Sequence, residues 1–141
     1  MDDKAERLAI ILFSGTVDKL MAAAILTTGA VAMGMEVDLF LTNWGLMAFR
    51  QGAAATNQKI SKEYEEYAPA MMAAMQAKGV PSWLDTLTQA KELGEVHIYA
   101  CSMTMELFGL QQSDLEAIVD DVTGVAGFME RAQASKISLF I

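Results

Sequence analysis

Residues 8–13 have the sequence LAIILF, a continuous apolar run that Ser14 and Gly15 end. A run without polar alternation is typical of a strand covered on both faces, as in a parallel sheet. Residues 18–33 are rich in Ala, Leu and Met and predict a helix, and the stretch EVDLFLT at 36–42 predicts a second strand. The first third of the chain therefore predicts a strand–helix–strand unit with a right-handed crossover.

The remainder of the chain continues this alternation. Ser82 is a suitable helix N-cap with Asp85 three residues later, so we expect a helix over 82–93. Further strands are expected at 95–100, 117–122 and 137–141, and further helices at 44–50, 61–78, 102–108 and 124–134, with a loop or weak helix start at 52–57. The sequence predicts one α/β domain over residues 1–141, with a mainly parallel five-stranded sheet and helices on both faces.

The charge balance argues against several classes of partner. The chain has 141 residues, 53% of them apolar, and 10 Lys and Arg against 18 Asp and Glu give a formal net charge of -8. Such an acidic chain gains little binding free energy from contact with nucleic-acid phosphates or anionic membrane surfaces, so we expect neither as a partner. The longest uncharged run, Leu20 to Met35, is shorter than the ~20 residues of a spanning helix. With no targeting segment evident, we expect a cytoplasmic protein without an integral membrane segment.

Cys101 is the outstanding candidate for chemistry. It follows the strand expected at 95–100 and opens the helix expected at 102–108, where free backbone N–H groups favour a thiolate. Ligands of parallel sheets bind at this edge, so Cys101 is predicted to be a nucleophile or sulfur carrier, or else a small buried apolar residue. A dyad with His97 is not expected within one chain, because four strand residues place the two side chains ~13 Å apart.

Neighbouring segments supply candidates for a pocket around Cys101. Trp44 could form a wall of this pocket, and Lys19 could stabilise a thiolate. Asp18 lies near the start of its helix, where a capping role is favoured over a role in the pocket. The candidate pocket residues are Ser14, Gly15, Asp18, Lys19, Asn43, Trp44, Ser102, Met103 and Met105.

Metals and cofactors are not expected at this site. Cys101 and Met105 would share a helix face, and both are soft ligands suited to copper(I). Two sulfur ligands are few for a metal site, however, and Met commonly fills gaps in hydrophobic cores. The loop at 14–19 lacks the spacing of a phosphate-binding loop, so a nucleotide is only an alternative.

Several ordered stretches resemble the DsrE/DsrF-like sulfur-relay family, in its peroxiredoxin-like subgroup. The matching stretches are SGTVDK at 14–19, AMGMEV at 32–37 with NWGL at 43–46, VPS at 80–82 with AKELG at 90–94, ACSMTME at 100–106 with Gly109, and the ending from GVA at 124–126 to LFI at 139–141. The likeness covers nearly the whole chain. The chain departs from relatives at 51–61, where a longer basic, Gly- and Met-rich insertion is often found.

The resemblance implies a DsrEFH-like α/β fold of flavodoxin/Rossmann-like architecture, assembled into homo-oligomers. It also implies that Cys101 bears a persulfide and exchanges sulfur with thiol-bearing donor and acceptor proteins. A lone cysteine has no resolving partner in the chain, so a classical peroxiredoxin is not expected. The sequence leaves open a catalytic sulfurtransferase, a passive carrier, a non-catalytic interaction subunit with a structural Cys101, and a small-ligand or nucleotide binder.

Overall fold

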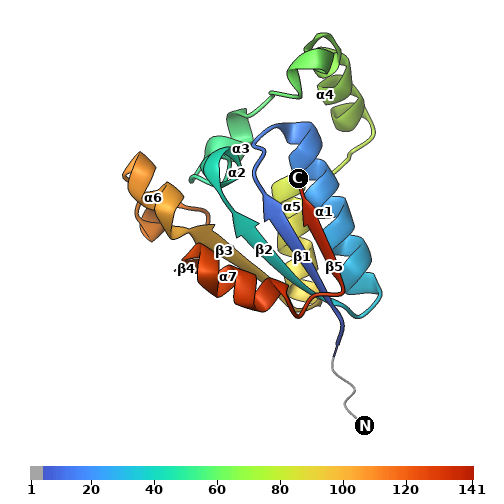
Figure 1. The fold of residues 1–141 in the computed structure, drawn as a ribbon. Coiled ribbons are helices and arrows are strands. Elements are labelled where there is room, and N and C mark those ends of the chain that lie inside the picture. Colours follow the sequence, from blue (N-terminus) through green and yellow to red (C-terminus); the bar gives the residue numbers. More distant parts are fainter. Residues whose placement is uncertain (1–4) are drawn as a thin grey trace.

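The computed structural model describes residues 5–141, which form a five-stranded parallel sheet in the order β4-β3-β2-β1-β5 (Figure 1). The strands are β1 (Arg7–Leu12), β2 (Glu36–Leu41), β3 (Val96–Cys101), β4 (Asp121–Thr123) and β5 (Ile137–Phe140). In the register of the central strands, Leu12 lies opposite Leu41 and Leu41 opposite Ala100, so β1, β2 and β3 end at one edge. The parallel α/β fold predicted from the apolar runs is confirmed.

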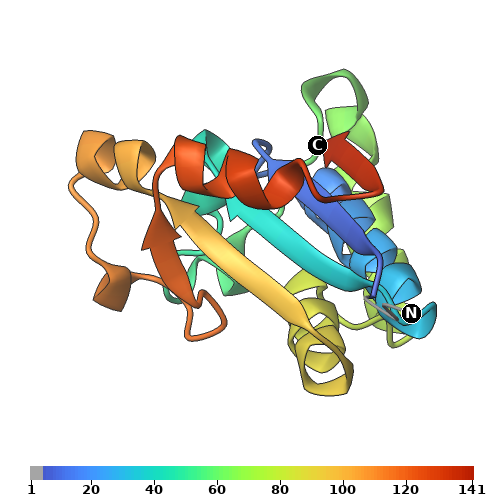
Figure 2. The same ribbon diagram turned by 60° about the horizontal axis from the view of Figure 1, so that its bottom comes forward.

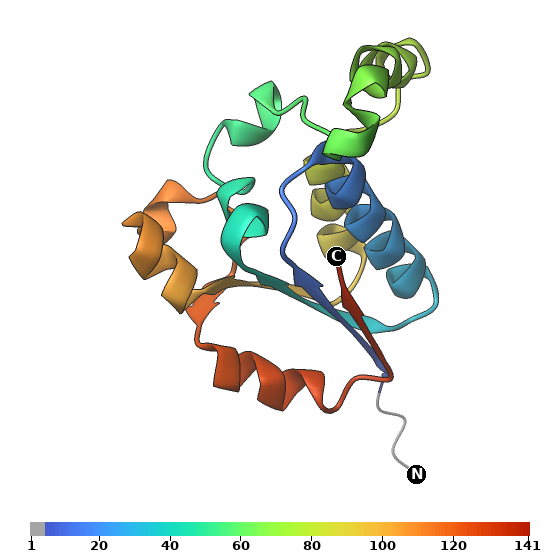
Figure 3. The same cartoon turned by 45° about the horizontal axis from the view of Figure 1, so that its top comes forward.

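Helices cover both faces of the sheet, as predicted. The α-helices are α1 (Val17–Ala32), α2 (Asn43–Met47), α3 (Ala53–Thr56), α4 (Ala68–Ala77), α5 (Trp83–Leu93), α6 (Ser102–Phe108) and α7 (Val125–Ala132). Figure 3 shows α1 and α5 on one face and α7 on the other. Figure 2 shows α7 crossing the sheet between β4 and β5. Strand residues therefore face either a broad two-helix layer or a single short helix.

The two faces have cores of different size. The larger core lies between the sheet and α1 and α5 and contains the alternate β1 residues Leu8, Ile10 and Leu12. The smaller core lies under α7, where the Phe40 and Phe128 rings stack with centroids 4.7 Å apart. Cys101 belongs to this smaller core. The reactive candidate thus has protein on its inner side.

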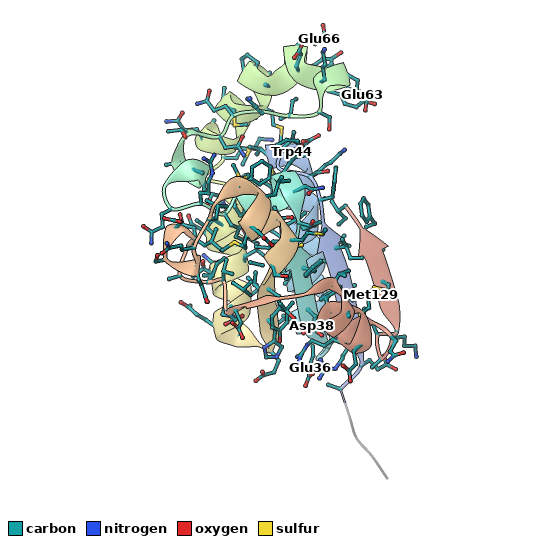
Figure 4. All side chains as sticks on the ribbon, turned by 60° about the vertical axis from the view of Figure 1, so that its left-hand side comes forward. Glu36, Asp38, Trp44, Glu63, Glu66 and Met129 are labelled. Atoms are coloured by element: carbon teal, nitrogen blue, oxygen red, sulfur yellow. The ribbon has the colours of Figure 1, made fainter. Side chains whose placement is uncertain are left out.

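A buried carboxylate connects α7 to the sheet. Asp38 on β2 has no exposed side-chain surface, and its two oxygens pair with Arg7 at 3.0 Å and with Arg131 of α7 at 3.5 Å. The Arg131 guanidinium also lies over the Tyr99 ring, 4.9 Å from its centroid. Figure 4 shows Asp38 beside α7, at the end of β2 away from Trp44. These contacts belong to the amino-terminal part of the sheet rather than to the edge with Cys101.

The single helix expected over 61–78 is wrong. Residues Lys62–Tyr67 form a 3-10 helix, η1, and α4 begins only at Ala68. Pro69 explains the division, because proline has no N–H to donate and its ring crowds the preceding turn, so it is tolerated only at a helix start.

The strand expected at 117–122 starts later, at Asp121. The Asp120 carboxylate accepts a hydrogen bond from the Ile98 N–H at 2.8 Å, and the Asp120 N–H donates to the Ile98 carbonyl at 2.8 Å. This side chain satisfies the edge of β3 before the ladder begins. Strand β4 consequently pairs only with the last residues of β3, from Tyr99 to Cys101.

Candidate functional site

Cys101 lies where β3 ends and α6 begins, at the edge shared by the carboxyl ends of β1, β2 and β3. Its exposed fraction is 7%, so the sulfur is recessed. The parallel register of β2 and β3 brings the residues after Leu41, namely Thr42 and Asn43, beside the start of α6. The site is therefore formed by two strand ends that are far apart in sequence.

Three polar groups are joined next to the sulfur. The Asn43 N–H donates to the Thr104 hydroxyl oxygen at 3.1 Å, and the Thr42 and Thr104 hydroxyl oxygens lie 3.2 Å apart. Asn43 has a φ of 48°, a left-handed conformation that Asn tolerates better than most residues. Thr104 is only 3% exposed, so its hydroxyl depends on these protein partners.

These groups alter the acidity of the thiol. Burial raises the pKa of Cys101, but hydrogen bonds from the Thr104 hydroxyl and N–H, the Thr42 hydroxyl and the Met103 N–H outweigh it. The pKa of Cys101 therefore lies below its ordinary value of 9.0. Hydrogen bonds to the charged form favour that form, and a larger thiolate fraction makes a better nucleophile near neutral pH.

A pocket of about 600 Å³ opens onto Cys101. Its lining residues are Thr42, Asn43, Cys101, Met103, Thr104, Glu106 and Leu107. Two apolar lining residues reach the surface, Met103 at 77% and Leu107 at 72% exposed, with Glu106 exposed beside them. Trp44, labelled in Figure 4, is exposed and packs on Phe108 with ring centroids 5.9 Å apart, but it lines a separate pocket of about 730 Å³ together with Gly15. The arrangement suits a thiolate that reacts with a group entering from outside.

The loop after β1, which was expected beside Cys101, makes its contacts with other segments. The Asp18 carboxylate accepts hydrogen bonds from the Ser61 hydroxyl at 2.6 Å and the Ser61 N–H at 3.3 Å. Burial raises the pKa of Asp18, but the bonds from Ser61 are among those that bring it below its ordinary value. The Gly15 carbonyl accepts from the Asn57 side chain at 2.9 Å. This loop holds the segment that leads to η1.

Ser14 and Lys19 open onto a second pocket, of about 670 Å³, rather than onto the Cys101 pocket. Its lining residues are Ser14, Thr16, Lys19, Ser61, Lys62, Glu63 and Glu65. Gly15 lies against the backbone of Trp44, where a Cβ would overlap the Trp44 carbonyl oxygen. The structure thus brings Gly15 to Trp44 and separates Ser14 and Lys19 from the thiol pocket.

The residues after Cys101 divide between surface and core. Ser102 and Met103 are exposed, and Met103 lines the thiol pocket. Met105 is 5% exposed and packs in the larger core, away from the pocket lining. His97 lies four residues earlier on β3, with its Nε2 atom 3.5 Å from the Glu95 carboxylate. Within residues 5–141, no group of three or more His, Cys, Asp and Glu side chains could hold a metal ion.

Sequence reasoning missed Thr42 and Thr104. Thr104 had a usable signal, since residues three apart on a helix start share a face, which places its hydroxyl over the residue at 101. Thr42 had no such signal, because its approach to Thr104 depends on the pairing of β2 with β3.

In the described part of the chain, no helix combines the length and apolar character needed to cross a bilayer.

Comparisons with known proteins identify a family model and two relatives that match nearly the whole chain. A family model described as the DsrE/DsrF/DrsH-like family matches residues 4–74 and 56–140. The chain is 34% identical over 164 aligned positions to the uncharacterized protein YrkE of Bacillus subtilis, covering 100% of both proteins. It is 29% identical over 160 positions to the sulfur carrier protein DsrE2 of Allochromatium vinosum, covering 96% of this chain and 98% of that protein.

Solved structures share the fold at low sequence identity. The ychN protein of E. coli aligns with a TM-score of 0.60 at 15% identity, covering 98% of this chain and 100% of that chain. The protein MTH1491 of Methanobacterium thermoautotrophicum, described as of unknown function, aligns with a TM-score of 0.57 at 15% identity, covering 95% and 96%. Both similarities concern the fold.

Proposed function

This chain belongs to the DsrE/DsrF/DrsH-like family, and from that membership and the setting of Cys101 we propose that it carries sulfane sulfur as a persulfide on Cys101. The observation that carries the proposal is a thiol with a lowered pKa at the base of an open pocket. The relative named a sulfur carrier protein supports a role in sulfur relay.

The proposed chemistry is exchange of one sulfur atom between thiols. The Cys101 thiolate attacks the sulfane sulfur of a donor, and the donor's thiolate leaves with the electrons of the broken S–S bond. The resulting persulfide is then attacked at its outer sulfur by an acceptor thiolate. Such exchange needs a thiolate and access rather than an acid–base pair. Thiol-bearing donor and acceptor proteins are the partners that this chemistry requires.

One observation favours a second function, a non-catalytic interaction subunit. Cys101 is 7% exposed and packs in the smaller core, as a structural cysteine does. In that case the exposed side chains of Trp44, Met103 and Leu107 would bind a partner protein without sulfur transfer. The reactivity of the thiol in the folded protein separates the two functions.

The test is intact mass after brief incubation with polysulfide. We expect an adduct of one sulfur atom, which a reductant removes and which the Cys101→Ser variant does not form. Circular dichroism and thermal unfolding of the variant serve as controls for its fold. A folded wild-type protein that takes up no sulfur and whose thiol resists alkylation would contradict the proposal and favour the interaction subunit.

We also propose that the protein is a homo-oligomer. The outward face of α1 carries no charge over its last three turns, where Ala22, Ile25, Leu26 and Gly29 are exposed. Beside it lies β5, which pairs with β1 on one side and with no strand of residues 5–141 on the other (Figures 1 and 3). An apolar open edge of this kind is normally covered in proteins.

A further inference from the structure

The Thr104 hydroxyl occupies an unusual position among the groups around Cys101. It is 3% exposed, and its oxygen already accepts a hydrogen bond from the Asn43 N–H at 3.1 Å. The Thr42 hydroxyl oxygen lies 3.2 Å away, and either of the two hydroxyls can donate to the other. With one of its acceptor positions filled by the Asn43 N–H, Thr104 donates its single hydrogen to one of the acceptors around it.

The available acceptors for that hydrogen are few. The Thr104 hydroxyl donates to the Asn43 side-chain oxygen at 3.5 Å, the limit of a hydrogen bond. The Cys101 sulfur belongs to the residue that caps the same helix and lines the same pocket, so it is a competing acceptor for that hydrogen. A thiol accepts weakly, whereas a thiolate forms a charge-assisted hydrogen bond. The hydroxyl therefore interacts most strongly with Cys101 when the sulfur is negatively charged.

Charged side chains do not supply this stabilisation. Among the described residues that line the pocket, the ionisable side chain besides Cys101 is Glu106, whose negative charge disfavours a thiolate. On α7, the cation Arg131 pairs with Asp38 and lies over the Tyr99 ring. Uncharged hydrogen-bond donors are therefore the groups that stabilise the thiolate. The donors that lower the pKa of Cys101 belong to Thr104, Thr42 and Met103.

We propose that Thr104, fixed by the Asn43 N–H, is a positioning residue that stabilises negative charge on the Cys101 sulfur during both the uptake and the release of sulfur. This inference rests on the proposed function for its second half only. During uptake, Thr104 stabilises the attacking thiolate. During release, an acceptor thiolate forms a bond to the outer sulfur, the bond from that sulfur to Cys101 breaks, and the Cys101 sulfur leaves with the electron pair while the proton stays on the transferred sulfur.

The first experiment measures the rate of iodoacetamide alkylation against pH for wild type, Thr104→Val and Thr104→Ser. Val keeps the shape and removes the hydroxyl, whereas Ser keeps the hydroxyl. We expect Thr104→Val to shift the profile to higher pH and to slow alkylation about tenfold near neutral pH, the effect of one lost hydrogen bond to an anion. Thr104→Ser should restore most of the rate. Thr88→Val on α5 is the matched control, since its hydroxyl donates to the Leu84 carbonyl at 2.8 Å, away from the Cys101 pocket.

The second experiment measures transfer of sulfur from the loaded protein to a small thiol. We expect Thr104→Val to slow release by a similar factor and Thr104→Ser to recover it. If Thr104→Val does not fold, Thr42→Val, which removes the hydroxyl 3.2 Å from that of Thr104, should give a smaller shift in the same direction. An unchanged alkylation profile in folded Thr104→Val or Thr42→Val overturns the inference. A shifted profile in a protein that never takes up sulfur instead contradicts the proposed function.

Discussion

At Cys101, the interpretation depends on a competition between burial and hydrogen bonding. Burial disfavours the thiolate, and a recessed sulfur with nothing else around it would be an inert core residue. The hydroxyls of Thr42 and Thr104 reverse the balance and bring the pKa of Cys101 below 9.0. Met103 and Leu107 add apolar side chains to the pocket in front of the sulfur. A persulfide there would be shielded yet open to an incoming thiol.

The lowered pKa of Cys101 makes a prediction about stability. When a folded-state pKa lies below the unfolded value, the charged group contributes stability that is full above the unfolded pKa and is lost as pH falls through the folded pKa. We therefore expect the free energy of unfolding of wild type, relative to Cys101→Ser, to increase from neutral pH to pH 9.0, the ordinary pKa of the thiol. Urea unfolding at a series of pH values measures it, and a pH-independent difference would contradict the hydrogen-bonded thiolate.

Among the elements, the short helix α2 has the strictest packing requirement. The Gly45 N–H donates to the Phe13 carbonyl at 2.8 Å, and a Cβ at Gly45 would overlap the Leu12 carbonyl oxygen. A Cβ at Gly15 would likewise overlap the Trp44 carbonyl oxygen. These two glycines let the loops after β1 and β2 lie in direct backbone contact. That contact sets the position of Asn43 beside Thr104.

Substitution of these glycines should distinguish close packing from ordinary helix propensity. We expect Gly45→Ala to lower the free energy of unfolding by about 1–3 kcal/mol, the usual cost of overpacking. Gly124→Ala at the start of α7 is the control, because a Cβ there makes only an ordinary contact, 3.8 Å from the Ser102 hydroxyl oxygen, and it should lower stability by less than about 1 kcal/mol. Chemical denaturation measures both. Equal effects of the two substitutions would contradict the packing argument.

For the molecule as a whole, the most informative feature is the exposed apolar surface on α1 and β5. Beyond Lys19, α1 has no charged residue, and a helix segment that is apolar on all sides is normally buried on all sides, yet Ile25 and Leu26 are 62% and 42% exposed. The open edge of β5 adds Ile137 and Phe140, which are 45% and 69% exposed. Both features accord with the proposed assembly of several copies.

A charge placed on this surface should disrupt the assembly. We expect Ile25→Glu to shift the protein toward a smaller species in sedimentation equilibrium, because burying an unpaired carboxylate at an interface is costly. Ser113→Glu, an exposed position on η2 (Gln112–Asp114), is the control and should leave the oligomeric state unchanged. A wild-type protein that sediments as a monomer at all concentrations would contradict the proposed homo-oligomer.

Local patterns in the sequence determined the elements of this protein. The run LAIILF predicted β1, and Ser82 caps α5 by accepting a hydrogen bond from the Asp85 N–H at 3.1 Å. Such features depend on neighbours a few residues away, so they can be read along the chain. The position of Cys101 at a strand end followed from the same patterns, as did the parallel fold. Where local signals conflicted, as at Pro69 in the helix expected over 61–78, the boundary was misplaced.

Tertiary structure alone decided what surrounds the sulfur. Thr42 and Thr104 are 62 residues apart, and only the register of β2 against β3 brings their hydroxyls together. Lys19 and Ser14 follow a strand at the same edge, yet they line a separate pocket beside the hydrogen bond from the Ser61 hydroxyl to the Asp18 carboxylate. Hydrogen bonds act over about 3 Å, whereas sequence patterns place whole elements, so the chemistry of Cys101 depends on contacts that the sequence does not encode locally.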